Sequence, residues 1–326
     1  MNHPSFSMGR RAFVASLALG SVGSVSAQGT YPNGPIRIVT PFNSGTVDIL
    51  GRAFAERLAE QMGAPVVVES LPGAGGIIGS SAVVRAVADG QTLLFTAVEP
   101  LVMAPLLLRR PPFDPLVDLT PISKIANSPM ILVAHPAAPF QTAAEMVGYA
   151  KQHPDKLFYA SSGAGTPDHI IMERLQEALG FKATITPYKS TAQKTADTLA
   201  GHVPVTLLSL SGAQQYLSAK SLRPLAIGSL TRRPELADVP AMAELTKAPF
   251  DGTLGYGFYG PAKLPPQIAA RLHNEISKAL SSTQIASTLP KLGSEVNLLD
   301  AKAFAAEMSR QQKEGRELVQ RLNLAQ

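Results

Sequence analysis

Residues 36–69 read IRIVTPFNSGTVDILGRAFAERLAEQMGAPVVVE, and this segment carries the pattern that the rest of the chain repeats. The apolar run at 36–40 predicts a strand, which the following proline ends because proline lacks the N–H that a strand ladder needs. Apolar residues at every fourth position predict a helix over 47–62, and the glycine after it is a typical helix terminator. A second apolar run at 66–69 predicts the next strand, so the segment forms a strand–helix–strand unit.

The alternation continues toward the C-terminus. We expect a helix of small residues over 77–88 and a strand over 92–96. Strands that are almost continuously apolar are typical of a parallel sheet covered on both faces. The first third of the chain therefore predicts such a parallel sheet.

The same pattern recurs in the second half. Further strands are expected at 130–134, 157–160, 184–188, 203–208, 222–227 and 254–259. Further helices are expected at 142–153, 169–179, 192–200, 265–280 and 301–322. Thr142 and Glu145 form the sequence signature of a capping box at the first of these helices. The chain therefore predicts an α/β protein of two doubly wound domains with a ligand cleft between them.

The second half resembles an insertion into the first, because another strand and long helices follow residue 250. We place the crossovers at 127–129 and at 247–252. Domain 1 would then comprise residues 28–127 plus 252–326, and domain 2 would comprise residues 128–251. Without residues 1–27 the chain keeps about 300 residues, which is enough for two cores.

The first 27 residues have the features of a cleavable export signal. Arg10 and Arg11 precede an apolar run at 12–25 that is too short to span a bilayer. The run ends in the small-x-small triplet Val25-Ser26-Ala27, so we expect cleavage after Ala27 and a periplasmic mature protein. The paired arginines leave the general secretory and the twin-arginine export routes both open.

Composition argues against several kinds of function. The chain has no cysteine, which excludes a lipid anchor, disulfides and thiolate metal sites. Its formal net charge is only +5, it has no tryptophan, and its basic residues form no stripe, so we expect no nucleic-acid partner. No segment after the signal is apolar enough for a transmembrane helix, so we expect no membrane anchor.

Three segments share one form, a strand followed by a turn of small residues and a helix start. They are loop one (residues 41–48), loop two (residues 72–79) and loop three (residues 161–169). Each would place backbone N–H groups at a helix N-terminus, where the helix dipole favours an anion such as a carboxylate. The alternative is that these glycines only make tight turns between strand and helix.

Enzyme motifs are mostly missing from the sequence. The glycines of loop two are out of register for a dinucleotide-binding fingerprint, and there is neither a P-loop nor a G-x-S-x-G elbow. The histidines are scattered without metal-ligand spacing, so no metal and no cofactor are expected. One enzymatic alternative remains, a periplasmic hydrolase that uses Ser161 or Ser162 with His169.

Across the mature chain, the sequence resembles the Bug family, the periplasmic solute-binding receptors of tripartite tricarboxylate transporters. The similarity lies in segments that follow one another along the chain: Tyr31–Pro32, Pro35–Val39, Pro41–Asp48, Val67–Glu69, Pro72–Gly76, Gly79, Asp89–Leu94, Tyr159–Gly165, His169, Pro187–Lys189, Leu222–Ala226 and Arg232–Arg233. Each segment alone is a weak signal, but together they cover the chain in order.

The resemblance implies a fold like that of type II periplasmic binding proteins and a receptor instead of an enzyme. Such a receptor captures a small carboxylate, which can be an organic acid, an aromatic acid or an amino acid. It serves uptake or sensing, so its partner would be a membrane transporter or a sensor, and we expect a monomer. By similarity, loops one and three hold the carboxylate. The implied ligand-binding residues are Phe42, Asn43, Ser44, Gly45, Thr46, Asp48, Thr96, Val98, Ser161, Ser162, Gly163, Gly165, His169 and Tyr188.

The chain also departs from the family pattern. Loop one has Gly45 alone where the family usually has two glycines, and it is one residue shorter. Ser190 stands where glycine is usual, and Ser70 stands where asparagine is usual. After the strand at 203–208 the chain has Ser209 where many members carry an aspartate that could pair with a ligand ammonium group. These departures favour a plain carboxylate over an amino acid as the ligand.

Overall fold

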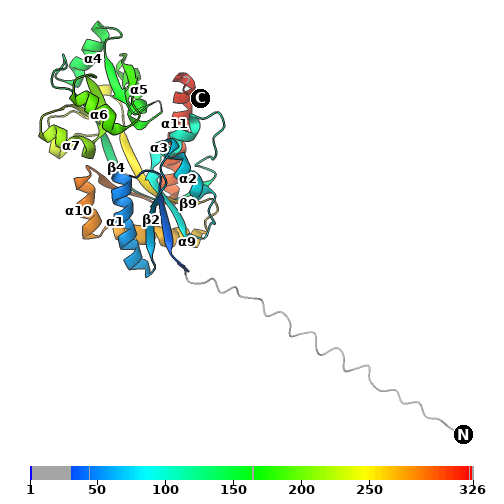
Figure 1. The fold of residues 1–326 in the computed structure, drawn as a ribbon. Coiled ribbons are helices and arrows are strands. Elements are labelled where there is room, and N and C mark those ends of the chain that lie inside the picture. Colours follow the sequence, from blue (N-terminus) through cyan, green and yellow to red (C-terminus); the bar gives the residue numbers. More distant parts are fainter. Residues whose placement is uncertain (2–30, 44, 164, 323, 325–326) are drawn as a thin grey trace.

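The structure is a computed structural model that describes Met1 and residues 31–43, 45–163, 165–322 and 324. The predicted export signal and its cleavage site after Ala27 fall outside the described residues. Within the described part, two α/β halves lie one above the other, with strands passing between them (Figure 1). No helix in that part is both long and apolar enough to cross a membrane.

Ten strands make up the sheet, in the order β2-β1-β3-β9-β4-β7-β5-β6, with β8 and β10 also paired to β4. The strands are β1 (Ile36–Thr40), β2 (Val66–Ser70), β3 (Thr92–Ala97), β4 (Leu119–Ala134), β5 (Phe158–Ser161), β6 (Thr184–Pro187), β7 (Val205–Ser209), β8 (Arg223–Ile227), β9 (Thr253–Pro261) and β10 (Glu295–Leu299). The prediction of an α/β fold is confirmed.

The helices are α1 (Gly45–Met62), α2 (Ile77–Val84), α3 (Val98–Leu106), α4 (Ala143–Gln152), α5 (Pro167–Leu179), α6 (Thr191–Leu199), α7 (Leu210–Ser218), α8 (Met242–Thr246), α9 (Pro266–Leu280), α10 (Thr283–Lys291) and α11 (Ala301–Leu322). The Thr142 hydroxyl accepts a hydrogen bond from the Glu145 N–H, so the predicted cap of α4 is confirmed. The helix predicted over 77–88 is shorter than expected and ends at Val84.

The parallel sheet predicted for the first third of the chain is confirmed, but the complete sheet is mixed. β1, β2 and β3 are parallel, as expected, but β3 pairs with β9 antiparallel. In the other half β5, β6 and β7 are parallel, whereas β4 pairs with β7 and β8 antiparallel. Burial of a strand on both faces gives the same continuous apolar pattern in either direction, so the sequence pattern could not determine strand direction.

β4 is the strand that joins the two halves. Its first part pairs with β9 up to the pair Pro129–Thr253, and its last five residues pair with β7 in the second half. The sequence predicted only the stretch 130–134, because prolines and polar residues interrupt the apolar pattern at 121–129. The predicted first crossover at 127–129 therefore lies inside a continuous strand. The domain boundaries placed at this crossover and near residue 251 stay a prediction.

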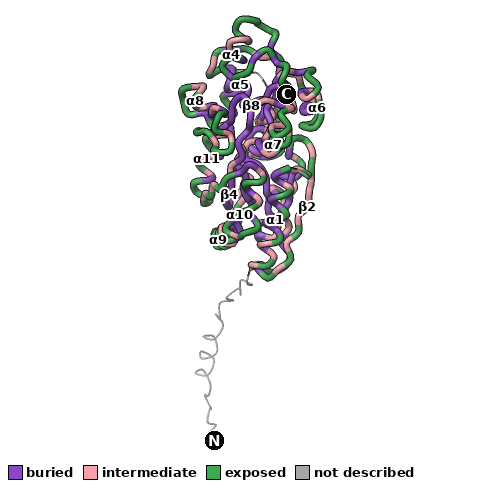
Figure 2. Tube along the Cα trace, turned by 90° about the vertical axis from the view of Figure 1, so that its left-hand side faces the viewer, coloured by how far each residue is buried: buried purple, intermediate pink, exposed green. Residues whose placement is uncertain are grey.

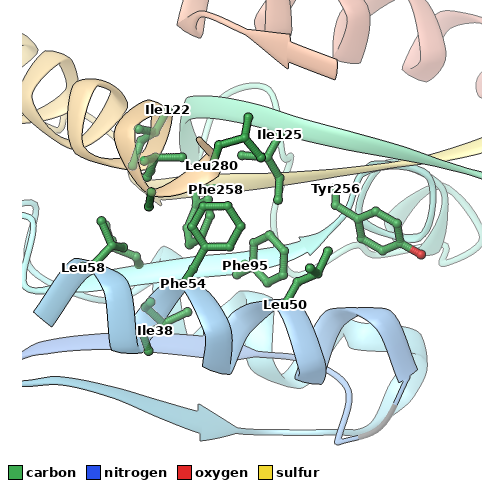
Figure 3. Close-up of a cluster of buried hydrophobic side chains, with 14 of the residues drawn as sticks. Ile38, Leu50, Phe54, Leu58, Phe95, Ile122, Ile125, Tyr256, Phe258 and Leu280 are labelled. Atoms are coloured by element: carbon green, nitrogen blue, oxygen red, sulfur yellow. The ribbon is translucent and has the colours of Figure 1, made fainter. Parts of the chain in front are cut away.

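Helices cover both faces of the sheet, as a doubly wound fold requires. On one face of the first half, α1, α9 and α10 bury a cluster around Phe54, Phe95 and Phe258 (Figure 3). On the opposite face, α3 and α11 bury a cluster that includes Val102 and Phe304. Separate clusters line the two faces of the second half, and buried positions run through the centre of both halves (Figure 2).

Candidate functional site

Loops one, two and three follow parallel strands, so they gather at particular edges of the sheet. Loops one and two follow β1 and β2 at one edge, and loop three and the turn with Tyr188 follow β5 and β6 at the other. Segments of the second half that follow β5 and β7 contact the first half at the boundary between the halves. A Cβ added to Gly165 of loop three would lie 1.9 Å from Leu107, which follows α3 in the first half. Leu210, which follows β7, similarly lies against Gly293.

Loop one turns from β1 into α1 at Gly45, whose φ of +75° favours glycine. Thr46 is buried, and its hydroxyl lies beside the phenol of Tyr256 on β9. Burial raises the pKa of Tyr256 to about 12, so the phenol stays protonated. Asp48 pairs with Arg52 one turn along α1, at 3.0 Å. Asn43 is exposed, Phe42 is half-buried, and Ser44 lies outside the described residues.

Loop two packs against loop one. A Cβ on Gly79 would lie 2.8 Å from the Leu71 carbonyl oxygen and 3.0 Å from Pro41, so only glycine fits there. A Cβ on Gly76 would touch the Phe42 ring at 3.4 Å. Gly79 therefore lets the backbones of loops one and two approach each other, which accounts for this glycine without a ligand.

Loop three is held by hydrogen bonds within itself. The Gly163 N–H donates to the Ser161 hydroxyl at 3.2 Å, and the Thr166 hydroxyl donates to the Gly163 carbonyl at 2.7 Å. The Gly165 N–H donates to Nδ1 of His169 at 2.9 Å, which assigns the ring proton to Nε2. Burial lowers the pKa of His169, so the neutral ring that can accept this bond is favoured.

A buried ion pair stands behind loop three. The Lys194 ammonium on α6 lies 2.7 Å from Asp168 in the first turn of α5. The same Asp168 oxygen accepts a hydrogen bond from the Ser162 N–H at 2.8 Å. Two charged side chains therefore connect α6 and α5 to the backbone of loop three.

Three predicted site residues remain, Tyr188, Thr96 and Val98, and each has a different environment. The Tyr188 N–H donates to the Ser161 carbonyl at 2.8 Å, which brings the two turns together. The pKa of Tyr188 is raised, mainly by burial and also by a hydrogen bond with Asp197. Thr96 lines a small hollow that Phe42 also lines. Val98 is the first residue of α3 and is fully buried in the core, so its side chain packs against protein.

A cavity of about 600 Å³ lies between the halves, along α3, α5 and α11. Gly165 is the predicted site residue that contributes to its lining. Glu99 on α3 also lines it and accepts a hydrogen bond from the Gly255 N–H of β9 at 3.1 Å. Burial raises the pKa of Glu99 to about 7. Arg321 on α11 and Glu177 on α5 close one side with an ion pair of 2.8 Å, where α11 rises from the first half (Figure 1).

Known proteins share this architecture and much of this sequence. Residues 50–324 match the TctC family, described as the tripartite tricarboxylate transporter family receptor. The chain belongs to this receptor family. BugT of Bordetella pertussis is 31% identical over 84% of this chain and 83% of its own.

Solved structures of similar receptors extend the comparison. The periplasmic binding protein BugD has 30% identity and a TM-score of 0.77, over 90% of this chain and 99% of its own. Rpa4515 of R. palustris, solved with adipate, has 28% identity and a TM-score of 0.79, over 89% of this chain and 97% of its own. The family resemblance and the periplasmic binding protein fold are thus confirmed.

The arrangement of loop three does not favour the hydrolase alternative. In a serine hydrolase, the nucleophile donates a hydrogen bond to an unprotonated histidine nitrogen. Here Nδ1 of His169 is occupied by the Gly165 N–H, and Nε2 lies 3.7 Å from Glu173. The Ser161 hydroxyl contacts Gly163 and Thr166 instead. Within the described residues, no group of three or more His, Cys, Asp or Glu side chains could hold a metal ion.

Sequence reasoning missed the buried ion pair and the Tyr256 phenol beside loop one. The sequence pattern assigns no role to Asp168, although it lies in loop three, and it places Lys194 only within a predicted helix. One signal was present, because Lys194 is four residues before Thr198 and therefore shares its helix face. A lysine on the inward face of a helix requires a buried partner, and Asp168 is that partner.

Proposed function

We propose that this receptor captures a small carboxylate at the boundary between its halves, where loops one and three lie at the facing sheet edges. Loop one presents the N-terminus of α1, and loop three presents the N-terminus of α5. The positive ends of two helix dipoles and their backbone N–H groups favour an anion between them. The implied ligand-binding residues of the sequence analysis are proposed as the contacts.

The observation that carries the proposal is the similarity to Rpa4515, whose structure contains adipate, a dicarboxylate. Nearly the whole of both chains is covered, and the fold similarity extends over both halves. The similarity therefore supports a small carboxylate as the class of ligand for this chain.

The end of β7 supports a plain carboxylate over an amino acid. The Ser209 hydroxyl accepts a hydrogen bond from the Gly212 N–H at 3.2 Å and caps α7. β7 runs parallel to β5, so Ser209 lies at the same sheet edge as loop three. A neutral hydroxyl in that position offers no charge to a ligand ammonium group, whereas an aspartate there would.

The cellular setting of the proposal follows from the export signal and the family. The mature protein would begin at Gln28 in the periplasm and act as a monomeric binding protein that catalyses no reaction. It would deliver its ligand to a membrane transporter or to a sensor. Its two domains would comprise residues 28–127 plus 252–326 and residues 128–251.

A thermal-shift screen of the purified mature protein tests this proposal. The panel contains mono-, di- and tricarboxylates, aromatic acids and amino acids, with sugars and cations as controls. At about 100 times its dissociation constant, a true ligand stabilises the folded state by about 2.7 kcal/mol, which raises the melting temperature of a protein of this size by a few degrees. A shift by a sugar or a cation, with none by any carboxylate, would contradict the proposal.

A further inference from the structure

The Lys194 side chain is almost fully buried although lysine is rarely found in protein interiors. Its side chain is 2% exposed, and that of its partner Asp168 is 5% exposed. A buried ammonium group is unfavourable unless a counter-charge and further hydrogen bonds replace its hydration. Both are present, since Lys194 donates to Asp168 at 2.7 Å and to the Leu207 carbonyl on β7 at 2.8 Å.

Asp168 links Lys194 to the backbone of loop three. Its Oδ2 atom accepts from both the Lys194 ammonium and the Ser162 N–H. Burial opposes its charge, but Lys194, Thr166 and the Ser162 N–H hold the pKa of Asp168 below its usual value. Asp168 is therefore an anion at neutral pH, and it fixes the Ser162 peptide relative to α5, α6 and β7.

The positive charge of Lys194 also affects the electrostatics of the proposed ligand site. Asp168 lies within loop three, which we propose holds a ligand carboxylate, and an unpaired anion there would repel the ligand in a medium of low dielectric constant. Lys194 neutralises Asp168 at the same oxygen that accepts the Ser162 N–H. Asp168 can therefore order loop three without repelling the ligand carboxylate, because the Lys194 ammonium group neutralises its charge.

We propose that Lys194 is a positioning residue for ligand capture: through Asp168 it fixes the Ser162 peptide of loop three and neutralises the nearby charge. The neutralising role of Lys194 rests on the proposed function, because it matters only for an anionic ligand. The ordering of loop three does not require any ligand and can be measured without one.

Three variants test the inference. Lys194→Met removes the ammonium group but keeps an apolar stem, and it leaves Asp168 unpaired. Asp168→Asn combined with Lys194→Met removes both charges, which preserves folding better than breaking the pair. Leu175→Ala is the control, because Leu175 is buried on the same helix in the hydrophobic core and makes none of these bonds.

The first readout is amide hydrogen exchange of the ligand-free protein. Losing a charge-assisted anchor should raise the exchange rate of the Ser162 amide about tenfold in Lys194→Met. The double variant should fall between Lys194→Met and the unmodified protein, and Leu175→Ala should leave the Ser162 rate unchanged. Equal Ser162 rates in Lys194→Met, the double variant and Leu175→Ala would overturn the positioning role.

The second readout is the dissociation constant for adipate, measured by calorimetry at 25 °C where all variants are folded. Lys194→Met should bind about tenfold more weakly, and the double variant should regain part of the loss because the unpaired anion is gone. If adipate binds equally to all variants and the Ser162 rates are equal, this inference fails while the proposed function stands. If no carboxylate binds the unmodified protein, the proposed function fails, and amide exchange still decides whether Lys194 orders loop three.

Discussion

His169 accepts a backbone hydrogen bond through Nδ1, and only its neutral ring can do so. Burial lowers its pKa in the folded protein below the ordinary value of 6.5. Between these two pKa values, the unfolded chain binds more protons than the folded one, so stability falls as the pH falls. The contribution of neutral His169 is therefore complete above pH 6.5 and is lost as the pH drops through the lowered value.

Urea unfolding from pH 8 to pH 5 measures this effect at a single residue. The unmodified protein should lose more stability below pH 6.5 than His169→Gln, which retains an acceptor but does not titrate. Parallel stability curves for the two proteins over this range would show that His169 is not held neutral by its surroundings.

Single residues also show how far the sequence could predict the site. Gly45 and Gly165 are implied by the family resemblance and lie in loops that the turn pattern predicts, and both have a φ of +75° that such turns require. Lys194 and Asp168 are 26 residues apart and meet only when α6 packs against β5 and β7 in the folded chain. Spacing within one element cannot show such a pair, because the contact depends on tertiary packing.

At the level of elements, the two strand-to-helix turns offer a matched comparison. Gly45 and Gly165 share the same φ, but a Cβ on Gly45 would meet no atom within 4 Å, whereas one on Gly165 would overlap Leu107. Gly45→Ala should therefore cost only the backbone strain of about 1–2 kcal/mol. Gly165→Ala should cost clearly more, because loop three must move away from α3.

Chemical denaturation of both variants measures the difference. Adding Leu107→Ala to Gly165→Ala should restore part of the lost stability, since it removes the atoms that the new Cβ meets. The same addition to Gly45→Ala should restore nothing. Equal losses for the two glycine variants would mean that loop three does not press against Leu107.

Regular elements were predictable where one periodicity held throughout. The helices at 142–153 and 301–322 match α4 and α11 within a residue or two, since their caps and apolar spacing agree. α10 was missed because it is short and carries Pro290 near its end. The start of β4 was missed because its prolines and Lys124 do not resemble a buried strand, although Lys124 is neutralised there by Glu307.

In the whole molecule, the two halves touch at several points besides β4 and β9. Arg321 pairs with Glu177 at 2.8 Å beside the cavity, and Arg233 pairs with Glu295 elsewhere on the boundary. The Arg321–Glu177 pair is exposed, and exposed pairs of this kind contribute only about 0–1 kcal/mol. The two-half organisation followed from the repeated alternation in the sequence, but the antiparallel strands that connect the halves did not.

The central claim concerns both halves at once, namely that one carboxylate is held between loops one and three. The most direct measurement is a nuclear magnetic resonance titration of isotope-labelled mature protein with the carboxylate that gives the largest thermal shift. The amide signals of Thr46 and Gly163 should move together and give a single dissociation constant. Movement confined to one loop, or to residues of the cavity such as Arg174 and Arg310, would contradict the account.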